Sequence, residues 1–171
     1  MKRLLVWLST FLFIILIILF QINFLDKISL FTVIPSIGVV FVSAIGIVSG
    51  ANVGGFVGGT YGLLVDTFCG KALGIYFFLY LVLGVISGLF KNKMSTNNKL
   101  SLAFMVVFGT AFVETSYVLL NKIAYRIDVS MFSFLKVLLL EEIYNLILTY
   151  ILFRSFMLWG EIINRSKNIY S

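Results

Sequence analysis

Long apolar runs, separated by only a few polar residues, limit what this chain can fold into more than any other feature. In the first run, about twenty mostly apolar residues from Leu4 to Phe24 follow Lys2 and Arg3, enough for a helix to cross a bilayer core of about 30 Å. Of the 171 residues, 61% are hydrophobic and 12% are charged, whereas soluble domains carry about 25% charged residues. Because such a chain could not cover its surface with polar groups, we predict an integral membrane protein.

Six such runs predict an all-α polytopic membrane protein with about six transmembrane helices in a compact bundle. We expect a single integral membrane domain over residues 1–171, with spans at 4–24, 31–49, 53–68, 73–90, 100–120 and 132–159. The first run ends without the small-residue cleavage site of a signal peptide, so we expect it to be retained. The third run is short and rich in glycine, which leaves open whether it crosses fully or is tilted, broken or re-entrant.

The basic residues orient these predicted spans. Six crossings place both termini on one side, and with the termini inside, eight Lys and Arg residues lie on the inner face and five on the outer face. The inner set is Lys2, Arg3, Lys91, Lys93, Lys99, Arg154, Arg165 and Lys167. We therefore expect cytoplasmic termini. The net charge of +6 is scattered at the ends of apolar runs, so we expect the lipid bilayer and not nucleic acid as the partner of these charges.

Glycines recur at four-residue steps along the third run and just beyond it. The series is Gly54, Gly58, Gly62, Gly70 and Gly74, with Asp66 at the remaining step and Gly55 and Gly59 beside it. Residues four apart share one face of a helix, and each interior glycine costs about 1 kcal/mol relative to alanine. Seven glycines here therefore predict a face against which another backbone packs closely, and we hypothesise that a partner helix does so. Small-residue faces are common among packed spans and do not identify the partner.

Polar residues recur at helical spacing in three other runs. They are Tyr76 and Tyr80 in the fourth run, Thr110, Glu114, Tyr117 and Asn121 in the fifth, and Glu141, Asn145 and Thr149 in the sixth, with Glu142 adjacent. A charge at membrane depth costs at least roughly 2.5 kcal/mol, so we expect Asp66, Glu114, Glu141 and Asn145 to face a shared interior. Two interpretations stay open: a cavity in which the acids act as ligands or switches, or hydrogen bonds between helices worth about 0.6 kcal/mol each.

The residue inventory argues against catalysis. The chain has no His and one cysteine, Cys69, so an intrachain disulfide is excluded and we expect no metal and no cofactor. No Ser or Cys stands beside a plausible base, and no phosphate-binding Lys-Ser/Thr follows the glycines. We do not expect an enzyme.

The order of these features resembles the bacterial rod shape-determining MreD family. The resemblance rests on a basic start and first run, Pro35 at the start of the second run, Gly54-Gly55-Phe56-Val57-Gly58-Gly59, Gly62-Leu63-Leu64-Val65-Asp66, and then Gly70 and Gly74. It implies a subunit of the cell-elongation machinery, or elongasome, in the bacterial cytoplasmic (inner) membrane. The implied partners are a single-span MreC-like protein and, through it, a RodA-type glycosyltransferase with its transpeptidase and MreB filaments, which together organise lateral peptidoglycan synthesis. The resemblance also implies a fold similar to the substrate-binding subunits of energy-coupling-factor transporters.

Two other functions remain as alternatives. The first is a small-molecule-binding subunit of an energy-coupling-factor type vitamin importer, although the first run lacks the alanines with which such subunits contact their transporter. The second is proton-coupled transport through Asp66 and Glu114, which requires the two carboxyl groups to share a water path.

Overall fold

The computed structural model of the chain describes residues 2–21, 35–68, 74–91, 99–125 and 130–168. Six helices make up this part of the chain, which confirms the all-α prediction. They are α1 (Lys2–Phe20), α2 (Ile37–Ser49), α3 (Ala51–Phe68), α4 (Ile75–Leu89), α5 (Lys99–Tyr125) and α6 (Met131–Asn168). Parts of the predicted spans, including residues 31–34 and the segment with Gly70, lie outside the described residues.

Helix α2 forms the centre of the molecule. Each of its residues from Ile37 to Ser49 is buried, and it contacts α3, α4, α5 and α6. Its near-continuous run of Val, Ile, Phe and Ala suits a helix that is covered on every side. A single residue, Gly50, joins α2 to α3, with a φ of +93° that favours glycine.

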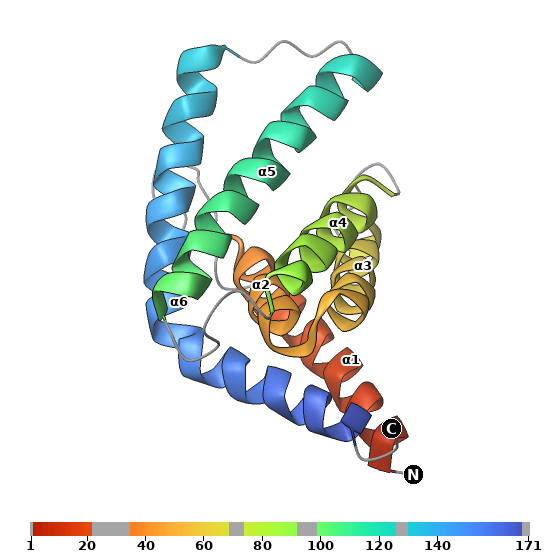
Figure 1. Ribbon diagram of the computed structural model, residues 1–171. Helices are drawn as coiled ribbons and strands as arrows, with labels where there is room; N and C mark the ends of the chain where they lie inside the picture. The colour runs from red at the N-terminus through yellow and green to blue at the C-terminus, as the bar shows by residue number, and fades with distance from the viewer. Residues whose placement is uncertain (1, 22–34, 69–73, 92–98, 126–129, 169–171) are drawn as a thin grey trace.

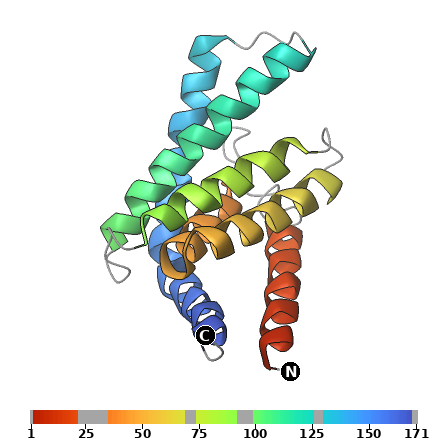
Figure 2. The ribbon, with the colours of Figure 1, turned by 45° about the vertical axis from the view of Figure 1, so that its right-hand side comes forward.

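The other helices surround α2 in a defined order. Helices α3 and α4 form the most extensive pair, and α3, α4 and α5 run side by side in Figure 2. Helices α5 and α6 form a hairpin whose far end projects beyond the other helices, as Figure 1 shows. Helix α1 lies at the edge, where the Trp7 and Phe56 rings meet with centroids 5.1 Å apart.

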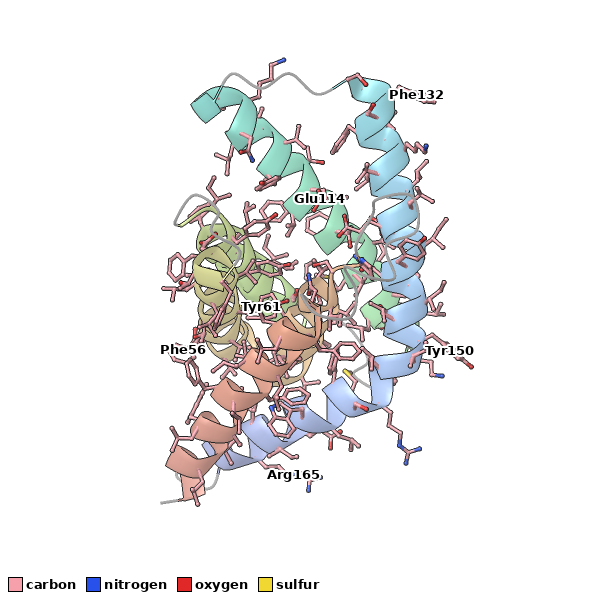
Figure 3. All side chains as sticks on the ribbon, turned by 180° about the vertical axis from the view of Figure 1, so that it is seen from behind. Phe56, Tyr61, Glu114, Phe132, Tyr150 and Arg165 are labelled. Carbon is pink, nitrogen blue, oxygen red and sulfur yellow. The ribbon has the colours of Figure 1, made fainter. Side chains whose placement is uncertain are left out.

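Helix α6 is longer than the predicted span 132–159 and changes direction between Tyr150 and Arg165 (Figure 3). Its first part runs beside α5, and its last part crosses the end of α2 to reach α1 (Figure 1). The Ser49 hydroxyl donates to the carbonyl oxygen of Gly160 at 3.0 Å. The Trp159 ring stacks on Phe13 of α1 with a centroid distance of 4.6 Å. The last part of α6 thus ties the outer helix to the central one.

Two helical stretches, Lys99–Ile123 and Met131–Ile163, are long and apolar enough by themselves to cross a bilayer. Three shorter apolar stretches are Leu5–Phe20, Ile37–Ser49 and Ile75–Leu89. Large apolar side chains are also exposed on each of the six helices except α2, Phe132 at 80% and Ile123 at 71% among them. This surface suits lipid contact, and the expectation of six full crossings stays a prediction.

Candidate functional site

The glycine face of α3 is covered by α4 of the same chain. A Cβ atom added at Gly54, Gly58 or Gly62 would overlap a backbone carbonyl oxygen of α4, and the three oxygens belong to Gly84, Tyr80 and Tyr76. In return, a Cβ atom at Gly84 would overlap the carbonyl oxygen of Gly54. The close backbone approach that the spacing predicts is therefore made inside the chain. A partner helix has no access to these three glycines while α4 occupies the face.

The remaining glycines of the series have different surroundings. Gly55 and Gly59 face side chains of α4, with Val85 Cγ2 2.7 Å and Phe77 Cε2 3.2 Å from the added Cβ atoms. Gly74 is exposed, has a φ of +102° and leaves open space where a Cβ would be. It therefore serves the turn before α4 and not the packed face. Gly70 lies outside the described residues.

Asp66 caps the start of α4. Its side chain is buried, with 2% exposed, and its carboxylate oxygens accept hydrogen bonds from the backbone N–H groups of Gly74 at 2.9 Å, Tyr76 at 3.1 Å and Phe77 at 3.0 Å. A helix start carries unpaired N–H groups and a partial positive charge, so a carboxylate there is stabilising. Both oxygens of Asp66 are engaged in this way. The position that breaks the glycine series thus holds α3 and α4 together at one end.

Asn145 is the centre of a polar cluster between helices. Its amide oxygen accepts from the backbone N–H of Ser36 at 2.8 Å, and its amide nitrogen donates to the Thr110 hydroxyl at 2.9 Å. The Thr149 hydroxyl donates to the main-chain carbonyl oxygen of Asn145 at 2.7 Å. Asn145 and Thr110 are fully buried. One side chain of α6 therefore joins the residue before α2 to α5.

Tyrosine rings extend this cluster toward α3 and α4. The hydroxyl groups of Ser36 and Tyr80 are hydrogen-bonded at 2.9 Å. The Tyr80 ring packs on Tyr61 of α3 and on Tyr76, with centroids 4.9 Å and 6.1 Å away, and Tyr76 stacks on Tyr117 of α5 at 5.1 Å. At the far end of the row, the Tyr61 hydroxyl donates to the side-chain oxygen of Gln21 at 3.0 Å. The row thus connects the residue that follows α1 with α3, α4 and α5.

Glu114 and Glu141 meet beside this cluster. Glu141 is buried, with 5% exposed, and its carboxyl group interacts with Glu114 across the α5–α6 contact and with Asn145 one turn along its own helix. Glu114 is half-buried and points from α5 toward α6 in Figure 3. The structure therefore brings Glu114, Glu141 and Asn145 together, as the polar spacing predicts.

Two members of the cluster were missed in the sequence. Ser36 contributes its backbone N–H, and a backbone group cannot be recognised from the residue type. Its position after the only proline does mark the start of a helix. Tyr61 lies between Thr60 and Gly62 on the glycine-rich helix, where it resembles an ordinary apolar residue. Within the described residues, no group of three or more His, Cys, Asp or Glu side chains is placed to hold a metal ion.

The part of the chain that the structure describes is all-helical, with many exposed apolar side chains and a hydrogen-bonded polar cluster between its helices, which is typical of a helical membrane protein. The family model described as rod shape-determining protein MreD matches residues 1–159, so the chain belongs to the MreD family, and its role lies in rod-shape determination. Comparison with curated proteins and with solved structures gave no match. The expected similarity to substrate-binding subunits of energy-coupling-factor transporters is therefore unconfirmed, and the vitamin-importer alternative receives no support.

Proposed function

We propose that this protein is a non-enzymatic membrane subunit of the bacterial cell-elongation machinery. In this role it binds a single-span MreC-like protein and, through it, helps to place a RodA-type glycosyltransferase, its transpeptidase and MreB filaments where lateral peptidoglycan is made. It lies in the cytoplasmic membrane with both termini in the cytoplasm. Membership of the MreD family over residues 1–159 is the observation that carries the proposal.

The use of the polar side chains supports a scaffold. The side chains of Asp66, Asn145 and Thr110 form hydrogen bonds that join one helix to another. Side chains committed to holding helices together leave the outer surface for recognition of other proteins. That surface is rich in apolar side chains, which suits contact with the transmembrane helix of another protein as well as with lipid.

Co-purification tests the proposal. The tagged chain and the MreC-like protein of the same organism are expressed together, extracted in mild detergent and captured through the tag. We expect the MreC-like protein in the captured complex, and an unrelated single-span protein expressed at the same level should be absent. Loss of the MreC-like protein from a complex in which the captured chain is folded would contradict the proposal.

A second arm examines the cellular role. Depletion of the chain should turn rod-shaped cells into rounded ones, and expression of the intact chain should restore rods. If depleted cells keep their shape and their pattern of lateral wall synthesis, the assignment to elongation fails, whatever the chain binds.

A further inference from the structure

We propose that Lys99, Tyr150 and Arg154 form a binding surface for the headgroup of an anionic phospholipid. Lys99 is the first residue of α5, and its ammonium nitrogen lies 4.0 Å from the centre of the Tyr150 ring on α6. Arg154 follows Tyr150 by four residues on α6, so the two side chains lie on the same face one turn apart. The start of α5 thus places one cation over the Tyr150 ring, and α6 carries a second cation one helical turn from that ring.

The two cations are available to a ligand. Lys99 and Arg154 are both exposed, and within the described residues neither forms an ion pair. The acidic side chains that the structure describes are placed elsewhere: Asp66 caps α4, Glu114 and Glu141 meet in the polar cluster with Glu142 adjacent, and Glu161 pairs with Arg165 at 3.6 Å. The ring beneath Lys99 holds the ammonium group by a cation–π contact and leaves its N–H donors free to point outward.

The surroundings favour an anion at the membrane boundary. Tyr150 is 71% exposed and points away from the bundle in Figure 3. Exposed tyrosines beside apolar surface are typical of the headgroup level of a bilayer. The first turn of α5 carries no acidic residue, so the positive end of its macrodipole adds to the two cations. A phospholipid offers both the anion and the acyl chains that suit the neighbouring apolar side chains Ile147 and Ile151, which are 52% and 65% exposed.

Lipid titration tests this surface. The full chain is purified in nanodiscs of phosphatidylcholine and in discs with equal parts of phosphatidylcholine and phosphatidylglycerol, and retained phospholipids are counted by native mass spectrometry after extraction. We expect preferential retention of phosphatidylglycerol, which weakens as salt increases. Arg154→Gln and Lys99→Gln should each weaken apparent phosphatidylglycerol affinity about fivefold, because each basic residue near an anionic surface contributes a comparable amount.

Matched variants separate this surface from general charge effects. Arg165→Gln removes a guanidinium group that already has a carboxylate partner, so it should leave the affinity unchanged, and Arg154→Lys should keep most of it. The thermal unfolding midpoint in phosphatidylcholine discs shows whether each variant is folded. Equal retention of the two phospholipids by the intact chain, or equal losses in Arg154→Gln and Arg165→Gln, would overturn the proposal. None of these measurements involves the MreC-like protein.

Discussion

At the scale of single residues, the structure separates two acids that the sequence presents alike. Asp66 and Glu114 are both carboxyl groups within apolar runs, and each was a candidate for a shared interior. The carboxylate of Asp66 meets backbone N–H groups at the start of α4, whereas Glu114 meets Glu141. Spacing can place a residue on a helix face, but it cannot say which helix end will approach that face. The distinction therefore required the tertiary structure.

The capping role of Asp66 predicts an order of stability among its variants. Asp66→Ala removes all three acceptor contacts and should lower the free energy of unfolding by about 1–2 kcal/mol. Asp66→Asn keeps one side-chain carbonyl oxygen, so its free energy of unfolding should lie between those of the unchanged chain and the alanine variant. Denaturant unfolding in detergent micelles measures this order. An asparagine variant less stable than the alanine variant would contradict capping. Restoration of rod shape by Asp66→Asn would also argue against proton transport through this carboxyl group.

Asn145 predicts a second residue-scale effect. Asn145→Ala leaves the buried N–H of Ser36 and the hydroxyl of Thr110 without their partner, which should cost about 1–3 kcal/mol of unfolding free energy. Asn121→Ala is the matched control, because that amide donates to the main-chain carbonyl oxygen of Tyr117 on its own helix. The control should change stability by less than about 0.5 kcal/mol in the same unfolding experiment. Equal losses in both variants would show that the cluster does not join the helices.

At the scale of helices, the glycine spacing predicted a close backbone contact but not its partner. The repeat on α3 is matched by Gly84 and Gly88 on α4, and both faces are visible in the sequence. Two faces with four-residue repeats in consecutive helices are compatible with each other, yet also with an external helix. The sequence does not predict the bend of α6, because no proline interrupts the run from 132 to 159 and the apolar pattern continues through the bend.

Neighbouring glycines on α3 should respond in opposite directions to alanine. At Gly58 the added Cβ overlaps the Tyr80 carbonyl oxygen, so Gly58→Ala forces two backbones apart and should cost about 1–3 kcal/mol. At Gly59 it meets only the side chains of Phe77 and Leu81, at 3.2 Å and 3.5 Å, which can move slightly. Gly59→Ala should therefore be neutral or gain up to about 1 kcal/mol from helix propensity. Thermal unfolding of both variants in one detergent checks the pair, and a more stable Gly58→Ala would refute the contact.

At the scale of the whole molecule, the class and the helix order followed from the sequence, and the arrangement of the helices did not. Long apolar runs predict helices, because a segment that crosses a membrane must satisfy its backbone hydrogen bonds internally. The central position of α2 is harder to foresee, because its Val- and Ile-rich sequence resembles a lipid-facing helix as closely as a buried one. In a membrane, composition alone does not separate these two surroundings.

The predicted orientation of the whole molecule has its own test. With Cys69 replaced by Ser, single cysteines are introduced at Ile162, exposed on α6 beyond the predicted span 132–159, and at Ser130, exposed just before that helix. Cytoplasmic termini predict that a membrane-impermeant maleimide added to intact cells labels the cysteine at 130 and leaves that at 162 unlabelled until the membrane is opened. The reverse pattern would invert the topology.

The fit between α3 and α4 also restricts how the molecule can move. Carbonyl oxygens of α4 occupy the spaces that the missing side chains of Gly54, Gly58 and Gly62 leave, so a slide of one residue in either direction would drive a side chain into a backbone. Such a pair has one register and turns or tilts only as a rigid body, held together at one end by Asp66 and joined to α2 at the other end by the turn at Gly50. A change of shape that transmits the arrival of a partner must therefore take place around this body, in α1 at its edge or in the projecting α5–α6 hairpin.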